Sequence, residues 1–474
     1  MTPPHGRASR DDVQRSGADV LPGVFAPSYL LPVPGRRPVR RTPVGDLVAE
    51  TLGIDGQRPG SAVLPVVRDG RDPVPDAVFG TPGPPRAHGP GCAAALAVDA
   101  LGRGVDRAAA VRYARAALAD PDCGADPGCA WHAMVTLIEA DDLPAADAGC
   151  ERLATLPLGE VGEQVRALVR GRISFLSGDA AGAREVLETR LADGVDPALE
   201  PAATAWLTEA LAELGDVRAA GELLVRRGYE DALPGGEAGR ALLLAARGRL
   251  RMAEGGVLRG VKDHLLCGRE LANAGFTNGA VLAWRSRAAL GALALRSQDL
   301  AVELARAELE SARTWEAPRA LGWALYVVAL AEHGDRGVAL VTESVDLLDF
   351  ARARSELVRA LYDLAQLLNS RGDLSRARRA LKRATAVAEE CGNAYWAGHC
   401  ANALRTLADG TPEEVLTNQE ARVAELARAG YRNDEIAGKM GLTRRTVEFH
   451  LSSIYRKLGI AGRRDLHTAM TSRS

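Results

Sequence analysis

The chain has few aromatic residues, almost no lysine and no long hydrophobic run. Aromatic residues make up 4% of its 474 residues while hydrophobic residues make up 47%, so Ala, Leu and Val supply most of the apolar mass. Ala and Leu favour helix, whereas β-branched and aromatic residues favour strand. The composition therefore predicts an all-α protein, and the length allows two to four domains with a sizeable core.

The hydrophobic runs are too short to cross a membrane. The longest covers nine residues, 323–331, whereas a spanning helix needs about 20. The N-terminus lacks the basic and apolar segments of a secretory signal. Seven scattered cysteines, an odd number, fit free thiols in a reducing cytoplasm. We therefore expect a cytoplasmic protein with no membrane partner.

The charge pattern excludes little by itself. Only four of the 59 basic residues are lysine and the net charge is −2. Such arginine bias is typical of a GC-rich coding genome, so a single arginine is weak evidence for phosphate binding. No GxxxxGK[ST] phosphate loop occurs, and the one Gly-Lys pair, Gly438-Lys439, falls inside a predicted helix. Since no acid–base or nucleophile set is recognisable either, we expect neither an enzyme nor a cofactor.

The first 90 residues differ from the rest in composition. They hold 16 of the 25 prolines, together with many Gly and Arg residues. Proline removes a backbone donor and disrupts helices and central strands. Residues 1–90 are therefore predicted to be a largely disordered arm, with a short helix near residues 44–52.

Residues 91–410 carry a recurring turn signal. The second residues of successive turns are separated by 37, 37, 40, 43, 36 and 38 residues. Glycine can end one helix in the left-handed conformation, and aspartate can cap the next. A period of this length predicts a helical solenoid. The turns are Asp142, Gly178-Asp179, Gly215-Asp216, Gly255-Gly256, Gln298-Asp299, Gly334-Asp335 and Gly372-Asp373.

The last repeat shows two apolar stripes with helical spacing. Leu357, Leu361, Leu364, Ala365 and Leu368 precede the turn, and Leu374, Ala377, Leu381, Ala384 and Ala388 follow it. The segment 372–384 resembles the tetratricopeptide repeat, with Ala377 and Ala384 at its small-residue positions. The resemblance implies a TPR-like solenoid of paired helices.

Three features inside the repeats have alternative interpretations. Cys123, Cys129 and His132 suggest a metal site, but their spacing does not match a zinc knuckle, so loop and core thiols are favoured and no metal is expected. The six tryptophans are assigned to the core rather than to a ligand groove. The basic side chains at 376–383 are assigned to solvation rather than to DNA contact.

The residues after Thr411-Pro412 form a separate module, 411–474, in which short helices alternate with glycine. Thr417 and Glu420 fit a capping box for a helix to about residue 429, and Asn433 is the expected cap of a second helix. A third helix is expected from Thr443 to Leu458, and a fourth from about 463 to 470. The pattern therefore predicts four short helices.

The third helix sorts its residues by angle. Val447, Leu451, Ile454 and Leu458 share one face, which packs with Val423, Leu426, Ile436, Met440 and Leu442. Arg445, Phe449, Ser452 and Arg456 lie opposite. Residues 443–474 carry seven Lys or Arg and two acids. This is the layout of a helix-turn-helix, whose second helix reads the DNA major groove.

Sequence motifs strengthen this interpretation. The chain carries Leu416-Thr417, Glu420, Gly430, Asn433, Glu435-Ile436-Ala437, Thr446-Val447, His450 and Leu458-Gly459. With these motifs, the module from about residue 415 resembles the LuxR-type (GerE-type) helix-turn-helix domain of bacterial transcription regulators. Repeats followed by such a module are similar to the C-terminal half of large actinomycete LuxR regulators, here without their ATPase domain.

The resemblance implies specific DNA contacts. Glu448, Phe449 and Ser452 would face bases, whereas Thr446, Arg456 and Lys457 would meet phosphates. Glu448 either accepts from a cytosine amino group or holds Arg444 or Arg445 in place. The fourth helix would dimerise through Asp465, Leu466 and Ala469. The predicted DNA-binding set is Arg444, Arg445, Thr446, Glu448, Phe449, His450, Ser452, Ser453, Arg456 and Lys457.

These features predict a sequence-specific regulator of bacterial promoters, an activator by family resemblance. It would act in the cytoplasm at the nucleoid, binding double-stranded promoter DNA as a homodimer and contacting RNA polymerase. The repeats would sense an unknown ligand or protein partner. The alternative is a TPR-like interaction scaffold that the module tethers to DNA or polymerase, and an enzyme is a distant third.

Overall fold

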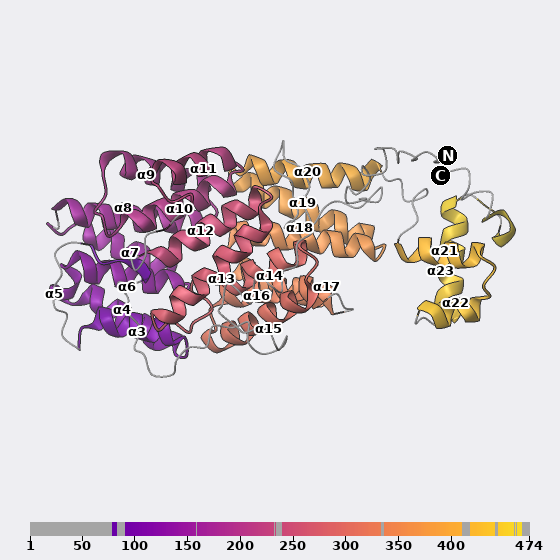
Figure 1. Ribbon diagram of the computed structural model, residues 1–474, viewed down its shortest axis with the longest axis horizontal. Helices are drawn as coiled ribbons and strands as arrows, with labels where there is room; N and C mark the ends of the chain where they lie inside the picture. Colours follow the sequence, from indigo (N-terminus) through magenta and orange to yellow (C-terminus); the bar gives the residue numbers. More distant parts are fainter. Residues whose placement is uncertain are drawn as a thin grey trace, which may run out of the picture. The chain divides into compact units, whose positions relative to one another are not determined.

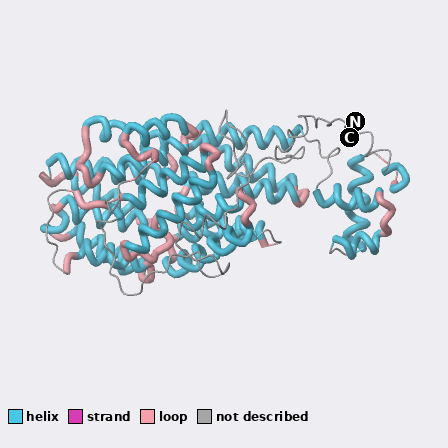
Figure 2. Tube along the Cα trace, viewed as in Figure 1, coloured by secondary structure: helices cyan, strands magenta, loops and turns pink. Residues whose placement is uncertain are grey.

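The computed structural model describes residues 78–82, 91–157, 159–231, 233, 239–332, 336–409, 418–440, 444–458, 460 and 462–466. Every regular element within these ranges is helical, and none is a strand (Figures 1 and 2). The protein is thus all-α, as its composition predicts. No helix in these ranges is both long enough and apolar enough to cross a membrane.

The helical array pairs its helices in chain order (Figure 1). It opens with α3 (Ala93–Arg103), α4 (Arg107–Ala119) and the short α5 (Pro121–Gly124). Successive pairs follow: α6 (Pro127–Glu139) with α7 (Leu143–Leu153), α8 (Gly159–Leu176) with α9 (Ala180–Asp193), α10 (Glu200–Glu213) with α11 (Val217–Arg226), α12 (Arg240–Ala253) with α13 (Val257–Asn273), α14 (Trp284–Ala294) with α15 (Gln298–Trp315), and α16 (Pro318–Glu332) with α17 (Gly337–Phe350). The array ends with α18 (Arg354–Ser370), α19 (Leu374–Glu390) and α20 (Ala394–Asp409), which Figure 1 shows next to one another.

The two helices of a pair are buried to different extents. In α10, 11 of 14 residues are buried, whereas in α11 only four of ten are. The even-numbered helix therefore packs on several sides, and the odd-numbered helix covers it with a single apolar stripe. The two stripes predicted for the last repeat are confirmed, since nine of their ten residues are buried and Leu374 is partly exposed. The array is the predicted TPR-like solenoid.

Most of the predicted turn signals cap helices as expected. Asp142, Asp179, Asp216 and Asp373 each accept the backbone N–H three residues ahead. Gly256 also precedes its helix, without a side-chain cap.

One predicted turn is shifted and another lies outside the described residues. At the fifth turn, Ser297 rather than Gln298-Asp299 precedes the helix, and Asp299 lies in its first turn. Arg296 there takes the left-handed conformation that glycine takes in neighbouring repeats. The turn predicted at Gly334-Asp335 falls outside the described residues.

Replacing Asp179 by alanine is expected to lower the free energy of unfolding by about 1 kcal/mol. The substitution removes the carboxylate that accepts the Gly182 N–H at 2.8 Å. Urea unfolding followed by tryptophan fluorescence measures the effect. Asp179→Asn is the matched control because asparagine caps equally well; a loss as large as that of alanine would contradict the capping role.

Loops more than four repeats apart in sequence lie side by side. Backbone carbonyls of Leu101, Glu139 and Glu213 accept hydrogen bonds from side chains 177, 176 and 180 residues later, at 3.0, 3.1 and 3.3 Å. The donors are Asn278, Trp315 and Asn393. Because the separation is nearly constant, the array winds back onto itself with a regular register.

Gly178 shows how tightly these loops pack. It has a φ of 101°, and a Cβ at this position would lie 2.6 Å from the Cβ of Arg354 and 2.7 Å from the Sγ of Cys391. Only glycine satisfies both the backbone conformation and the space. Gly178 thus serves the contact between successive superhelical turns as well as the helix end, and a Cβ on Gly215 would lie as close to Tyr395.

Part of the predicted N-terminal arm belongs to the array. Val78 and Phe79 are buried, and the Phe79 ring packs edge-on against Phe276 with centroids 5.9 Å apart. The Phe79 carbonyl accepts from Trp131 Nε1 at 3.1 Å. The surrounding prolines hide this short apolar anchor from composition analysis. The other residues of the predicted arm, including its expected helix near 44–52, lie outside the described residues, apart from residues 80–82.

Candidate nucleic-acid interface

The described part of the C-terminal module contains three helices and a short 3₁₀ turn. These are α21 (Asn418–Arg428), α22 (Asn433–Met440), α23 (Arg444–Leu458) and η2 (Arg463–Asp465). They match the predicted first three helices to within about a residue. Of the predicted fourth helix, only its beginning through Leu466 is described. The turn at residues 441–443 and the proposed cap Thr417 lie outside the described residues.

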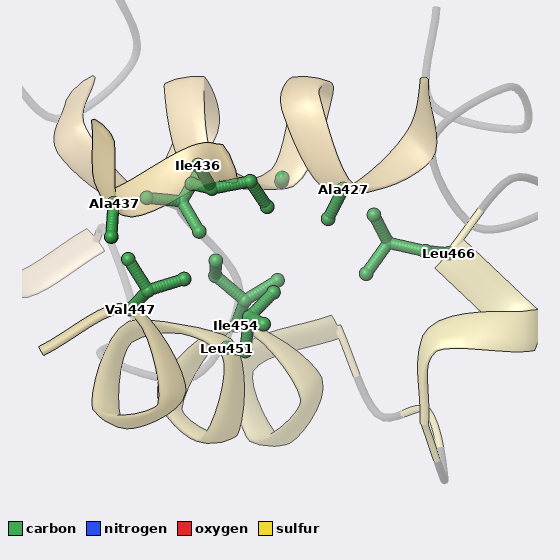
Figure 3. Close-up of a cluster of buried hydrophobic side chains, with 9 residues drawn as sticks. Ala427, Ile436, Ala437, Val447, Leu451, Ile454 and Leu466 are labelled. Carbon is green, nitrogen blue, oxygen red and sulfur yellow. The ribbon is translucent and has the colours of Figure 1, made fainter. Parts of the chain in front are cut away.

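A small apolar core fixes α23 against the other two helices (Figure 3). Val447, Leu451 and Ile454 point from α23 toward Ile436 and Ala437 of α22. Among the described residues, this core contains Val423, Ala424, Ala427, Ile436, Ala437, Val447, Leu451, Ile454 and Leu466. Leu426, Met440 and Leu458 are partly buried against it. The predicted inward face of α23 is confirmed, and among its described side chains Arg444, Glu448 and Ser452 are exposed.

Two details at the helix ends correct the prediction. Asn433 is the first residue of α22 rather than its preceding cap, and its Oδ1 accepts from Arg463 Nη1 at 3.2 Å. The capping contact is instead made by Glu435, whose Oε2 accepts the Arg432 N–H at 2.7 Å. A carboxylate at the third position of a helix can accept the N–H of the residue that precedes the helix, as in a capping box.

Arg463 ties the start of the fourth segment to the first two helices. Its guanidinium donates to the carbonyls of Ala427 and Tyr431, as well as to Asn433. A cation at the carbonyl end of α21 also complements the helix dipole. Sequence reasoning counted Arg463 only as basic charge, and nothing in the local pattern identified it as a structural clamp.

Arg444 opens α23 and is held by two carboxylates. Its Nε donates to Glu448 Oε1 at 2.9 Å, and its Nη1 lies 3.7 Å from Asp434 Oδ2 on α22. This hydrogen bond holds the pKa of Glu448 below its ordinary value. Glu448 therefore holds Arg444 in this structure, and its base contact stays a prediction.

The other predicted contact residues also lie on α23, but only some of their side chains are described. Ser452 is exposed, but its hydroxyl donates to the Glu448 carbonyl at 2.9 Å. Thr446 and His450 are half-buried. The remaining predicted contacts share the helix, but their side chains lie outside the described part: Arg445, Phe449, Ser453, Arg456 and Lys457.

The predicted dimerisation residues are only partly consistent with the structure. Leu466 is fully buried in the core of the module, so it stabilises the module rather than facing a partner. Asp465 is exposed. Ala469 lies outside the described residues.

The helical array contains a second concentration of functional groups, which we call the central polar cluster. It is formed by residues on or next to the even-numbered helices α6 to α18: Glu139, Asp141, Arg172, Glu209, Glu213, Arg249, Arg287, Arg319, Glu356 and Arg359. Arg172 contacts Glu209 at 2.5 Å, and Arg319 contacts Glu356 at 3.3 Å. Five guanidiniums therefore face five carboxylates.

Electrostatics within the central polar cluster are strongly perturbed. Burial lowers the pKa of Arg287 to about 9, helped by Arg249 and Arg359. Burial raises the pKa of Glu139 to about 7, against the opposing effect of Arg172. Perturbed groups of this kind are common at binding and catalytic sites.

The tryptophans belong to both the core and the central polar cluster. All six are buried. The guanidiniums of Arg287 and Arg359 stack 4.5 Å from the rings of Trp323 and Trp396. Among the described residues, the Nε1 atoms of both tryptophans have no hydrogen-bond acceptor. The array thus offers unused donors beside charged groups.

Three cysteines also meet, including Cys92, which sequence spacing does not group with Cys123 and Cys129. The Cys92 Sγ lies 3.5 Å from that of Cys123 and 3.6 Å from that of Cys129. His132, the third residue considered in the sequence, instead contacts the Gly80 carbonyl at 3.0 Å and Thr81. Sequence spacing missed the group because Cys92 lies 31 residues before Cys123.

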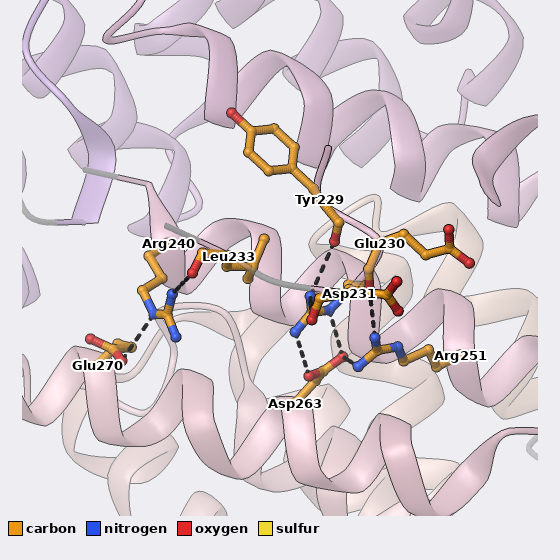
Figure 4. A network of polar contacts seen from close by, with 9 residues as sticks. Tyr229, Glu230, Asp231, Leu233, Arg240, Arg251, Asp263 and Glu270 are labelled. Carbon is orange, nitrogen blue, oxygen red and sulfur yellow. Dashed lines mark hydrogen bonds and ion pairs between the residues drawn. The ribbon is translucent and has the colours of Figure 1, made fainter. Parts of the chain in front are cut away.

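A surface pocket near α11 to α13 adjoins a polar network that has a structural explanation (Figure 4). Arg247 pairs with Asp263 through two bonds of 3.0 and 2.9 Å, and Arg251 contacts the same carboxylate at 2.7 Å. Arg247 also donates to the carbonyls of Tyr229 and Glu230. These arginines fasten the connection between α11 and α12, so their donors are already used.

Comparisons with known proteins place the module in a family. The family model described as "Bacterial regulatory proteins, luxR family" (GerE) matches residues 414–470. The chain is 42% identical over 50 residues to the HTH-type transcriptional regulator MalT of Cronobacter sakazakii, and equally to that of Yersinia enterocolitica. Each match covers 10% of this chain and only 6% of the MalT protein.

Two solved structures share a loose similarity with the helical array. A Rap protein complexed with competence and sporulation factor is 12% identical, with a TM-score of 0.41 over 72% of this chain and 99% of that one. The apo form of RapI is 10% identical, with a TM-score of 0.33 over 70% and 97%. With its three-helix core, the outward face of α23 and the family match, the segment 414–470 is a LuxR-family helix-turn-helix domain.

Proposed function

We propose that the protein is a sequence-specific transcription regulator that binds bacterial promoters through α23. The observation that supports this function is the LuxR-family match of residues 414–470, together with the core that holds α23 by its inward face. The exposed side of a second helix in this motif enters the major groove. The described part of the module places Arg444, Glu448 and Ser452 on its exposed surface.

DNA binding at this surface would change the ion-pair partners of Arg444. In the free protein, its guanidinium is shared between Glu448 and Asp434. A phosphate would compete with these carboxylates for the same donors, whereas Glu448 itself would repel the backbone unless it accepts a base amino group. We therefore assign phosphate contacts to Arg444, Arg445, Thr446, Arg456 and Lys457. The base contacts are assigned to Glu448, Phe449 and Ser452, with His450 and Ser453 beside them.

Arg445→Ala is expected to weaken binding to specific and nonspecific DNA alike, since a phosphate contact carries no sequence information. Phe449→Ala should instead relax sequence preference by roughly 1 kcal/mol, because an aromatic ring against a thymine methyl is a base contact. Competition binding on matched and scrambled sites separates the two effects. Equal losses on all sequences for Phe449→Ala would contradict its base-reading role.

The helical array is the proposed receiver of the signal. Its central polar cluster combines five guanidiniums, five carboxylates and unused tryptophan donors. Several of these charged side chains keep 10–17% of their surface accessible, among them Arg172, Arg319 and Arg359. A polar ligand or a protein segment carrying both charges would find complementary partners here. Its binding would control a homodimer on DNA, a contact with RNA polymerase, or both.

A second function is favoured by the size of the array, which could act as an interaction scaffold tethered by the module. Deleting residues 411–474 separates the two. If transcription is lost while partner binding persists, the module is the output and the array the sensor. If regulation survives the deletion, the scaffold is the correct function. We place the protein at the nucleoid in the cytoplasm, as a non-enzymatic activator without a cofactor in its regulatory role.

A further inference from the structure

We propose that Cys92, Cys123 and Cys129 form a thiolate site for a soft metal ion, with Zn²⁺ as the ion it fits best. The three Sγ atoms all lie within 4.8 Å of one another. They come from three different elements: Cys92 immediately precedes α3, Cys123 lies in α5 and Cys129 in α6. The three cysteines lie at the N-terminal end of the helical array. The proposed metal site therefore does not depend on the proposed DNA binding.

The spacing of the sulfur atoms suits zinc. A Zn–S bond is about 2.3 Å long, so sulfurs at the corners of a tetrahedron around zinc lie about 3.8 Å apart. Cys92 Sγ already lies 3.5 and 3.6 Å from its two neighbours. These two distances would need to change by only a few tenths of an ångström, and the third pair of sulfurs lies within 4.8 Å. Thiolate ligands select zinc and other soft ions over magnesium or calcium.

Two copies of one short motif position Cys123 and Cys129. The sequence Asp-Pro-x-Cys occurs at residues 120–123 and again at 126–129. In each copy the aspartate caps a helix, proline takes the first helical position, and the aspartate accepts the cysteine N–H, at 2.8 Å in the first copy and 2.9 Å in the second. The backbone of both ligands is thus fixed before any ion binds, which lowers the ordering cost of binding.

The third ligand and the coordination sphere are also favourable. Cys92 precedes the 11-residue helix α3, whose N-terminal N–H groups stabilise a thiolate. Cys129 is 2% exposed, whereas Cys92 and Cys123 are partly exposed. An ion has access from that side, and a water molecule can complete four-coordination there. A disulfide would use only two of the three thiols.

A bound metal ion would link the residue before α3 to α5 and to the start of α6. The ligands span 31 and 37 residues of sequence. Trp131, two residues after Cys129 in α6, also holds the buried anchor by donating from Nε1 to the Phe79 carbonyl. Ion binding should therefore raise the thermal midpoint of the array, because an ion that binds only the folded chain stabilises it.

The test uses the reduced full-length protein, with Co²⁺ as the spectroscopic probe and Zn²⁺ as the competitor. We expect the protein to bind one equivalent of Co²⁺ and to show a thiolate-to-cobalt charge-transfer band. One equivalent of Zn²⁺ should displace the Co²⁺ and abolish this band. Cys92→Ser and Cys129→Ser should each weaken Zn²⁺ binding by more than about 100-fold. Cys391→Ser, another partly exposed cysteine, is the matched control and should leave stoichiometry and affinity unchanged.

Two results would overturn the site. The first is the absence of stoichiometric metal in wild-type protein that circular dichroism shows to be folded and thiol titration shows to be reduced; the cysteines would then be three packed free thiols. The second is a native disulfide between two of them, detected by mass spectrometry without reductant. The wild-type titration decides the matter even if a serine variant fails to fold.

Discussion

Replacing Glu213 by alanine is expected to lower the free energy of unfolding of the helical array by about 3–5 kcal/mol. Glu213 is fully buried, and its Oε2 accepts from both Arg249 and Arg359, the latter at 2.6 Å. The alanine variant would leave two enclosed guanidiniums without this partner. Removing one member of a buried ionic group costs far more than the intact group contributes, because the remaining charge is still desolvated.

The position of Glu213 makes the effect global rather than local. Arg359 comes from α18, 146 residues away, and the backbone carbonyl of Glu213 accepts from Asn393 at 3.3 Å. The residue therefore joins α10 to helices of the next superhelical turn. Losing it should loosen the contact between turns as well as the local helix.

Urea unfolding monitored by tryptophan fluorescence measures this loss. All six tryptophans lie in the array, so the signal excludes the C-terminal module. Glu151→Ala is the control, because its ion pair with Arg170 is exposed and worth less than about 1 kcal/mol. A loss for Glu213→Ala no greater than that of the control would show that the buried network is not structural.

Replacing Ile454 by alanine is expected to abolish DNA binding while leaving the array intact. Ile454 is fully buried, in a small core that comprises nine of the described residues. Truncating a buried isoleucine costs about 2–5 kcal/mol, which is comparable to the whole stability of a domain of this size. The module would then be largely unfolded, and α23 would lose the support that orients its outer face.

Two measurements on the same protein check this result. Fluorescence anisotropy with promoter DNA should show lost binding, while the tryptophan-monitored unfolding curve should match that of the wild type. Glu425→Ala, an exposed change on α21, is the control and should bind normally. Undiminished DNA binding by Ile454→Ala would mean that the three-helix core does not position the interface.

The inward face of α23 could be predicted from sequence because a single helix displays it with regular spacing. Val447, Leu451 and Ile454 lie at intervals of four and three residues, and the same periodicity revealed the stripes of the last repeat. Helix caps were predictable for the same reason, since Asp179 and Gly182 are only three residues apart. Local patterns thus carried most of the fold.

Contacts between distant segments were not predictable in this way. The pairing of Glu213 with Arg359 depends on the superhelical register, which no short window contains. The meeting of Cys92 with Cys129 likewise depends on how α3 packs beside α6. Sequence alone shows Arg463 only as a basic residue, because its bonds to Ala427 and Asn433 join segments 36 and 30 residues apart.

The most direct test of the central claim is equilibrium binding of the full chain to its own promoter at several salt concentrations. Genomic binding-site mapping would supply the promoter fragment, and a scrambled fragment of equal length would be the control. We predict binding at least about 10³-fold tighter to the promoter than to the scrambled fragment. The logarithm of the binding constant should also fall linearly with the logarithm of salt concentration, as expected when Arg and Lys side chains displace counterions from phosphates. Equal affinity for both fragments, or a flat salt dependence, would contradict the assignment of residues 414–470 as a promoter-reading domain.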